Sequence, residues 1–387
     1  FDRFYGFYGN CISYFSHISD LGECHNPDCF QDLRENTEPV RNQDGIHTTY
    51  VLNSAVTRII KQHDSSEPMF LYYPVANVHS PIAVPDGMVD ATEGALGQCI
   101  ENIVNPPRKI YAALTFLLDE AVDNMTRAMQ DSGLYENSVI IVASDNGADP
   151  LQQNKSAGGS GSNYPLRGMK GYMFDGGVRV PAFVHSPLLP PSVRGTKYHG
   201  LFHVTDWLPT VIGGIMDRAD LLPRKDFDGI DQWDAITLRG GQIRDSVLIN
   251  IDDYNGQGCK QSWSTAAFRL GDMKLVTNEA DLPIWPVVST KNVPFEMTVD
   301  WGGTMNWYLF NVTADPGESV NLMNEHPEIV GELSMRLQMY KSGMVNSSWC
   351  DSTTKKAVKT FNQTMFIGPW LEDSTVSCEP RCTMTMR

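Results

Sequence analysis

The chain has 387 residues, enough for one large α/β domain and a smaller one, since a domain takes roughly 100 to 200 residues. Thirty Lys and Arg against 46 Asp and Glu give a formal net charge of −16, which argues against a broad electrostatic footprint for nucleic acid or an anionic membrane. The sequence has no run of 18 apolar residues, so no membrane span is predicted.

Cysteines and glycosylation sequons indicate an oxidising compartment. The eight cysteines do not match a zinc site. Two pairs of cysteines are closely spaced, Cys24 with Cys29 and Cys378 with Cys382, but the two pairs lie far apart in the sequence and neither has histidines at the required spacing. Disulfides are therefore expected, and a local bridge between Cys24 and Cys29 is favoured. The asparagines of the five N-x-Ser/Thr sequons are Asn124, Asn154, Asn311, Asn346 and Asn362. We expect a secreted or lysosomal glycoprotein.

The first 150 residues alternate between helical and extended patterns. Apolar residues at the helical period predict helices over 50–63 and 114–128, and Gly133 is placed to cap the second helix. Each helix is followed by an apolar run, 69–75 and 139–143, that predicts a strand. This order is typical of an α/β fold with a mixed, mostly parallel sheet flanked by helices.

The predicted strand at 139–143 ends in a polar turn. Its run of small or β-branched apolar residues predicts burial on both faces, as in a parallel sheet. The turn Ser144-Asp145-Asn146-Gly147 then places a carboxylate and an amide where α/β sheets bind ligands, and both supply oxygens that suit a hard cation. The alternative is an Asx turn that only closes the strand.

A long loop and further elements follow the turn. Residues 148–177 are rich in Gly, Ser and Asn and contain Pro165-Leu-Arg-Gly-Met-Lys170-Gly, which favours a functional loop over a linker. Strands are predicted at 180–184 and 246–251, and Thr205 is placed to cap a helix that continues through Ile212.

The pattern changes near residue 260, where we place a domain boundary. A hairpin over 267–276, a strand over 307–311 and a helix over 327–340 predict a small α+β subdomain. The predicted organisation is therefore an α/β domain over 1–260, a subdomain over 261–345 and an extended tail over 346–387.

Four side chains follow predicted strands or lie in the long loop: His79, Asp145, Asn146 and Lys170. The carboxylate and amide suit a divalent cation, and an imidazole and an ammonium can hold the oxygens of a tetrahedral anion. Taken singly, each has a simpler interpretation: His79 before Ser-Pro can close a turn, and Lys170 among glycines can be a solvated loop lysine.

Together these features resemble the sulfatase family, and within it the arylsulfatase B-like branch. The similar segments, in chain order, are Phe1-Asp-Arg-Phe-Tyr-Gly-Phe-Tyr-Gly9, 69–81, 111–147, 163–189, 202–209, Asp228-Gly-Ile-Asp231 and 309–340. The resemblance implies an alkaline-phosphatase-like fold, Asp145 and Asn146 as ligands of Ca²⁺ or another divalent cation, and His79 and Lys170 as sulfate-binding residues. It also implies glycosylation at Asn124.

The family's nucleophile motif is absent from these residues. That motif is Cys-x-Pro-Ser-Arg, whose cysteine becomes formylglycine; Cys378-Glu-Pro-Arg381 lacks the serine and lies in the tail. An early Asp-Asp metal pair and a Gly-Lys-Trp-His-Leu-Gly segment are also absent. Because the family carries these motifs ahead of the point where Phe1 falls, we expect an N-terminal sulfatase fragment as partner. Without that fragment, this chain is predicted to be inactive and not to fold stably.

Two functions from different classes follow. The first is hydrolysis of aryl or glycosaminoglycan sulfate esters, with the partner supplying formylglycine. The second is a non-catalytic extracellular structural, storage or glycan-binding protein that keeps the fold. A phosphohydrolase of the wider superfamily is a third, disfavoured by the Lys170 loop. The resemblance further suggests that Cys350 forms a disulfide with the partner fragment.

Overall fold

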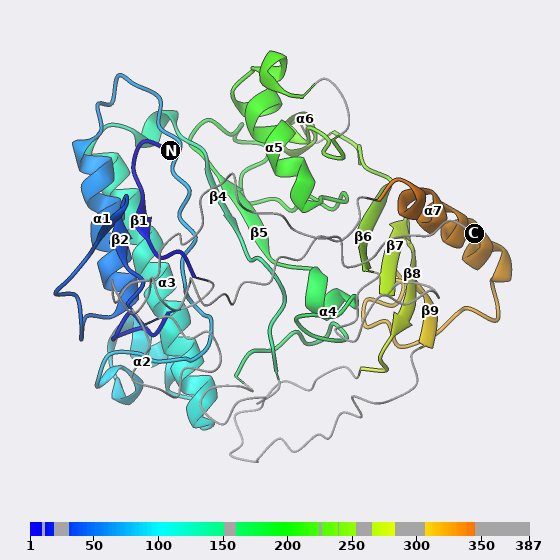
Figure 1. Cartoon of the computed structure of the whole chain (residues 1–387), viewed down its shortest axis with the longest axis horizontal. Helices are drawn as coiled ribbons and strands as arrows, with labels where there is room; N and C mark the ends of the chain where they lie inside the picture. Colours follow the sequence, from blue (N-terminus) through cyan, green and yellow to red (C-terminus); the bar gives the residue numbers. More distant parts are fainter. Residues whose placement is uncertain are drawn as a thin grey trace, which may run out of the picture.

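The computed structural model describes residues 1–9, 12–18, 31–150, 160–223, 227–238, 240–252, 265–282 and 306–344. Helices α1 and α3 form one side of the molecule, a two-stranded sheet lies at its centre, and a four-stranded sheet with helix α7 forms the other side (Figure 1). The described elements are β1 (Tyr5–Gly6), β2 (Arg34–Glu35), β3 (Glu38–Pro39), α1 (Thr48–Gln62), η1 (Met88–Asp90), α2 (Gly94–Ile100), α3 (Pro106–Asp131), η2 (Tyr135–Asn137), β4 (Ile140–Ala143), α4 (Asp175–Val178), β5 (Ala182–His185), η3 (Val204–Asp206), α5 (Trp207–Pro209), η4 (Thr210–Ile215), η5 (Ala219–Leu221), α6 (Trp233–Thr237), β6 (Ser246–Asp252), β7 (Thr265–Leu270), β8 (Met273–Glu279), β9 (Asn306–Asn311) and α7 (Pro327–Ser342).

The two predicted helices of the first half are confirmed as α1 and α3. Helix α3 begins after Asn105, whose side chain accepts a hydrogen bond from the Arg108 amide at 3.0 Å, and it has proline in its first turn. Gly133 follows its end with φ of 71°, a left-handed conformation that glycine adopts without a steric penalty. The apolar faces of α1 and α3 pack against each other around Ile60 and Met125.

The prediction of a strand over 69–75 is wrong. This segment is not assigned as a strand, and it pairs with no strand in the described part of the chain. Its side chains nevertheless alternate: Met69, Leu71 and Tyr73 pack against the helices, whereas Phe70 and Tyr72 are 70% and 69% exposed. The apolar pattern therefore produced one buried face, but a strand also needs a neighbour with which to share hydrogen bonds.

Strand β4 confirms the strand predicted at 139–143, although its environment differs from the prediction. It pairs antiparallel with β5, with Ile141 opposite Val184, and no described pair of strands is parallel. It is not buried on both faces, since Ala143 is exposed. The chain between the strands forms a loop with one helical turn, α4, rather than a crossover helix, and this loop brings β5 back antiparallel beside β4.

The helix predicted from Thr205 is instead a composite of η3, α5 and the π-helix η4. Its cap is His203, whose ring accepts a hydrogen bond from the Thr205 amide while the His203 amide donates to Asp206 at 2.9 Å. Asp206 is fully buried and forms an ion pair with Arg244. A histidine can perform this capping role because its unprotonated ring nitrogen is an acceptor.

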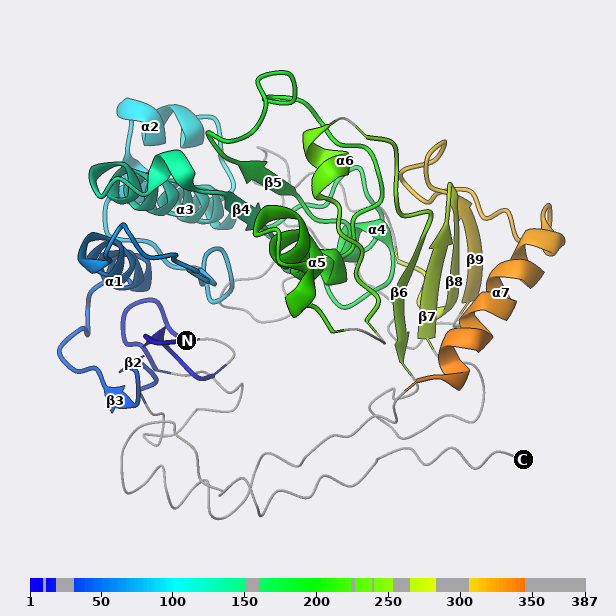
Figure 2. The same ribbon diagram turned by 90° about the horizontal axis from the view of Figure 1, so that it is seen from above.

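The C-terminal sheet has the strand order β6-β7-β8-β9, and every neighbouring pair is antiparallel. The predicted hairpin is confirmed, with Gly271 at φ of 56° in its turn. Helix α7 covers one face of the sheet through Leu333 and Leu337, and α4 lies on the opposite side (Figure 2). The domain boundary near residue 260 stays a prediction, although β6 already pairs with β7.

Candidate functional site

His79 and Lys170 are brought together from segments 91 residues apart. The Lys170 ammonium lies 3.3 Å from Nε2 of His79, and both side chains are exposed. Nδ1 of His79 lies 2.6 Å from the carbonyl oxygen of Ser80, so this nitrogen carries the proton and donates. Nε2 is then free to accept from the ammonium. The ammonium can donate to an oxygen of an anion directly, and Nε2 can do so only when it carries a proton.

The backbone around Lys170 is held close to the turn that follows β4. The Lys170 amide donates to the carbonyl of Ala148 at 3.1 Å, and the Gly147 amide donates to Gly177 at 2.8 Å. Glycine is required at 147, because a Cβ there would lie 1.8 Å from the carbonyl oxygen of Gly176. The loop and the turn therefore form one packed unit.

Asn163 joins the same two segments, and the sequence analysis did not identify this role. Its side-chain oxygen accepts from the Ala148 amide at 2.8 Å, and its nitrogen donates to the carbonyls of Ala148 and Gly168 at 2.9 and 3.2 Å. An asparagine side chain mimics a peptide group and can bridge two backbones in this way. The only signal in the sequence was its place at the start of a segment similar to the sulfatase family.

Asp145 and Asn146 lie in the turn itself. Asp145 is exposed and Asn146 is half-buried, and the turn is closed by a 2.9 Å hydrogen bond from the Ser144 hydroxyl to the Asn146 carbonyl. Within the described residues, no hydrogen bond or ion pair involves the Asp145 carboxylate or the Asn146 side chain. This differs from an Asx turn, in which the Asp side chain accepts from the backbone.

The donor chemistry of this turn fits part of a cation shell. A carboxylate and an amide oxygen suit Ca²⁺, which takes about six to eight oxygen ligands. Among the described residues, no group of three or more His, Cys, Asp or Glu is arranged to hold a metal ion. Asp145 and Asn146 by themselves supply fewer oxygens than such an ion takes.

Only two of the other predicted site residues are described. Asn124 is exposed on α3, and Asn311 is half-buried at the end of β9, where its side chain accepts from the Ala314 amide. Glycosylation of both stays a prediction. The remaining predicted positions, together with the predicted tail over 346–387, lie outside the described residues: Asn154, Asn346, Asn362, Cys24, Cys29 and Cys350.

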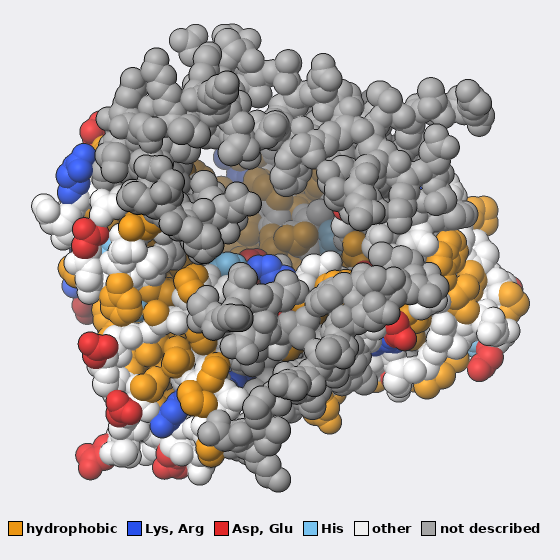
Figure 3. Space-filling view, turned by 60° about the horizontal axis from the view of Figure 1, so that its bottom comes forward, with side chains coloured by type: hydrophobic (Ala, Val, Ile, Leu, Met, Phe, Trp, Pro, Cys, Tyr) orange, Lys and Arg blue, Asp and Glu red, His pale blue; other side chains and the backbone are white. Residues whose placement is uncertain are grey.

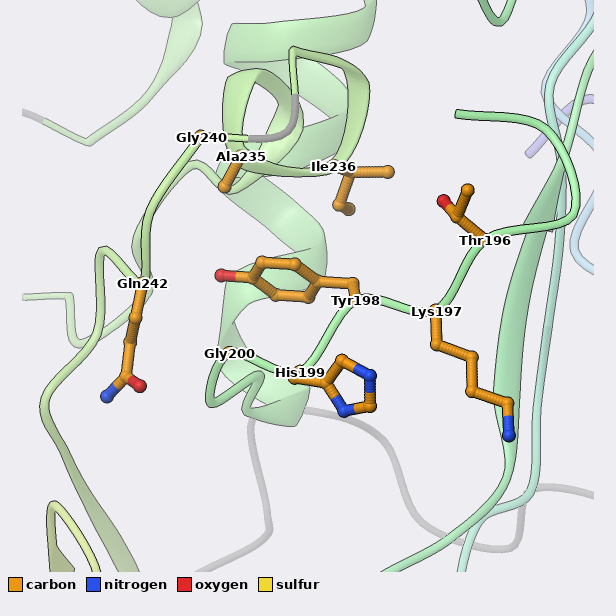
Figure 4. A pocket seen from close by; sticks show the side chains of 9 residues that line it. All are labelled: Thr196, Lys197, Tyr198, His199, Gly200, Ala235, Ile236, Gly240 and Gln242. Atoms are coloured by element: carbon orange, nitrogen blue, oxygen red, sulfur yellow. The ribbon is translucent and has the colours of Figure 1, made fainter. Parts of the chain in front are cut away.

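The structure has a pocket that none of the four predicted site residues lines. This pocket has a volume of about 450 Å³ and lies between the segment 196–200 and the residues Ala235, Ile236, Gly240 and Gln242 (Figure 4). Tyr198 lies within it, and the hydroxyl of Tyr198 donates to Gln232. Charged and histidine side chains of the described residues also come to the surface near the middle of one face of the molecule (Figure 3).

The fold and the site together define a class of protein. A family model described as Sulfatase matches residues 1–215, more than half of the chain, and the chain belongs to the sulfatase family. The structural comparisons confirm the predicted fold class. Ps i-CgsB superposes with a TM-score of 0.66 at 21% identity, covering 94% of this chain and 71% of that one. BT4656 superposes with a TM-score of 0.56 at 13% identity, covering 88% and 76%.

The chain is also similar in sequence to individual arylsulfatases. Arylsulfatase J of Mus musculus is 35% identical over 364 residues, covering 89% of this chain and 57% of its own length. Arylsulfatase A of Bos taurus is 26% identical over 347 residues, covering 88% and 59%. This chain therefore spans somewhat more than half of either relative. Among the described residues, no helix is long and apolar enough to cross a membrane.

Proposed function

We propose that this chain contributes the sulfate-binding half of a sulfatase active site, for hydrolysis of aryl or glycosaminoglycan sulfate esters. The observation that carries the proposal is the 3.3 Å contact between Lys170 and His79, on a loop bonded to the turn that contains Asp145. BT4656 is described as bound to its substrate D-glucosamine-2-N,6-O-disulfate, which supports a sulfated sugar as the substrate class.

In this proposal the two nitrogens have different roles. Lys170 donates from its ammonium to sulfate oxygens and neutralises their charge throughout the reaction. His79 has its Nδ1 proton directed at Ser80, which fixes the ring so that Nε2 faces the anion. In its protonated form, Nε2 can donate to an oxygen of the ester and stabilise the charge that develops when the ester bond breaks.

A cation and a nucleophile complete the proposed site. Asp145 and Asn146 would bind Ca²⁺ or another divalent ion, which would polarise the sulfate oxygens. The nucleophile would be a formylglycine, and the Cys-x-Pro-Ser-Arg motif from which it forms does not occur in these 387 residues. We propose that both the nucleophile and the remaining metal ligands come from an N-terminal sulfatase segment.

The exposed face of segment 69–75 supports such a partner. Phe70 and Tyr72 are exposed, as is Phe183 of β5 at 54%, and no backbone hydrogen bond within the described residues involves 69–75. An extended segment with unpaired backbone groups and exposed apolar side chains can pair with a strand from another segment of chain. Within this proposal Cys350 forms the covalent link. Gels run with and without reductant test that link, and identical mobility in both would contradict it.

Turnover by native material tests the function. The protein isolated from its source, with every polypeptide that accompanies this chain, is expected to hydrolyse a chromogenic aryl sulfate and to yield an aldehyde-bearing peptide in mass spectrometry. Intact material with neither property would favour the non-catalytic, glycan-binding alternative. A disulfide-bonded, N-glycosylated protein in a secreted or lysosomal setting remains part of the proposal.

A further inference from the structure

The loop that contains Lys170 is packed onto the inner face of the C-terminal sheet. Met173 and Phe174 share a buried cluster with Ala267 of β7 and Phe310 of β9, and Phe174 is fully buried. The Lys170 side chain itself is exposed. The sheet therefore holds the backbone of this loop while the ammonium reaches solvent, so residues of the C-terminal sheet can influence the geometry of the site from a distance.

Arg167, three residues before Lys170, makes the first connection. Its guanidinium donates to the carbonyls of Leu282 and, at 2.8 Å, Glu318, and it lies 4.3 Å from the centroid of the Phe174 ring. It is only 8% exposed. A planar guanidinium bonded at several nitrogens and stacked on an aromatic ring has little freedom to move. One end of the loop is thereby fixed to the C-terminal part of the chain.

A buried cluster of three charged residues makes the second connection; we call Asp175, Lys274 and Glu318 the ion cluster. The Lys274 ammonium lies 2.7 Å from Asp175 Oδ1 and 2.8 Å from Glu318 Oε1. The Asp175 amide, at the start of α4, donates to Glu318 Oε2 at 2.6 Å. Lys274 and Glu318 are fully buried, and Asp175 is 5% exposed. The other end of the loop is thereby fixed to β8.

The pKa shifts of the two carboxyl groups indicate that burial of the ion cluster has an energetic cost. Burial by itself raises the pKa of the Asp175 carboxyl, but the Lys274 ammonium together with the charges of Arg179 and Arg269 outweighs it and holds that pKa below its ordinary value. The pKa of Glu318 is raised, first by burial and then by the neighbouring Asp175 carboxylate, although Lys274 acts against both. Well-packed apolar residues often replace such clusters at no cost in stability, so stability alone does not explain this one.

We propose that Arg167 and the ion cluster are positioning residues that hold Lys170 beside His79 for sulfate binding. This inference rests on the proposed function of Lys170. One end of the loop is fixed to the segments that follow β8 and β9 and the other end to β8 itself, so the ammonium is already in place before the anion arrives, and binding costs less conformational entropy. Sulfate affinity should then depend on side chains that never touch the anion.

A double-mutant cycle on the complete protein tests the proposal, with inorganic sulfate as the probe in calorimetric titration. Lys274→Met is expected to weaken sulfate binding by about tenfold, within the range of couplings between residues of one network. Combined with Lys170→Ala, it should weaken binding no further than Lys170→Ala alone, because there is no ammonium left to position. Arg244→Met is the matched control, since it breaks a buried ion pair outside the loop and should leave sulfate affinity unchanged.

Glu318→Gln is the second variant in case Lys274→Met does not fold, because it keeps the shape and removes one charge. It should weaken sulfate binding less than Lys274→Met and speed hydrogen exchange of the Lys170 amide. Suppose that Glu318→Gln, and Lys274→Met if it folds, bind sulfate with wild-type affinity and exchange the Lys170 amide at the wild-type rate. That result overturns the positioning role but leaves Lys170 as a ligand. Sulfate binding that is insensitive to Lys170→Ala overturns the proposed function, and the positioning role with it.

Discussion

At the scale of single residues, the site depends on close backbone approach. Gly147 has no room for a side chain beside Gly176, so Gly147→Ala forces the turn and the Lys170 loop apart. Overpacking of this kind costs about 1 to 3 kcal/mol of folding free energy. Denaturant unfolding of the complete protein is expected to show that loss, together with weaker sulfate binding.

Gly331 is an exposed glycine that serves as the control for Gly147. It lies inside α7, and no atom lies within 4 Å of the position that an alanine methyl would occupy there. Gly331→Ala should raise the free energy of unfolding by up to about 1 kcal/mol, because alanine is the better helix former. Equal behaviour of the two variants would contradict the tight contact at Gly147.

A pH prediction follows from Asp206 and its partner Arg244. Burial acts to raise the pKa of the Asp206 carboxyl, but hydrogen bonds from Arg244 and from backbone amides outweigh it and lower that pKa. A lowered folded-state pKa adds stability that is complete above the unfolded value of about 3.9 and is lost as pH falls through the folded value. Asp206→Asn should therefore be destabilised at neutral pH by about 3 kcal/mol or more.

The stability of the same variant should depend on pH in a defined direction. In chemical unfolding at decreasing pH, the gap between wild type and Asp206→Asn should narrow below about pH 4, because the Asp206 carboxyl of the unfolded chain then takes up a proton while that of the folded protein still holds its charge. A gap that stays constant down to the acid limit would contradict the assignment of Asp206 as a charged partner of Arg244.

At the scale of elements, segment 69–75 carries a prediction about the partner. If strands from an N-terminal segment pair with it, its amides should exchange slowly in the complete protein, because paired backbone is protected. Hydrogen exchange measured by mass spectrometry would compare it with α3, which is already hydrogen-bonded within itself. Fast exchange over 69–75 in the complete protein would remove the support that this segment gives to a partner.

The elements also show what the sequence could and could not predict. Helices α1, α3 and α7 and the hairpin of β7 and β8 follow from patterns that are local in sequence, such as the helical period and Gly271. Strand pairing is not local. The run at 139–143 predicted a parallel, fully buried strand, yet β4 is antiparallel to β5, because partner and direction depend on how the distant loop returns.

For the candidate site, the sequence predicted which residues lie in it better than it predicted which other residues hold them in place. Lys170 and His79 were singled out by their place in loops and by family resemblance, and their contact confirms that the fold brings them together. Asn163, Lys274 and Glu318 were missed, because an isolated asparagine or a buried charge has no sequence signature. Their roles depend on neighbours 15, 99 and 143 residues away, respectively.

At the scale of the whole molecule, the chain belongs to the sulfatase family and spans 57% of the length of Arylsulfatase J. Its C-terminal sheet holds the loop that contains Lys170, and the segment that follows residues 69–75 supplies His79. The proposed activity needs both of these parts and also a nucleophile from outside these residues. In this proposal, one anion site is assembled from several segments of chain.

The most direct measurement is aryl sulfate hydrolysis by the complete protein with either of two exposed lysines changed. Lys170→Ala is expected to lower kcat/KM by about a hundredfold or more, because it removes a charge that stabilises the transition state. Lys197→Ala changes an exposed lysine of the separate 450 Å³ pocket and should leave kcat/KM unchanged. Equal rates for wild type and Lys170→Ala, or a loss confined to Lys197→Ala, would contradict the assignment of Lys170 and His79 as the sulfate-binding pair.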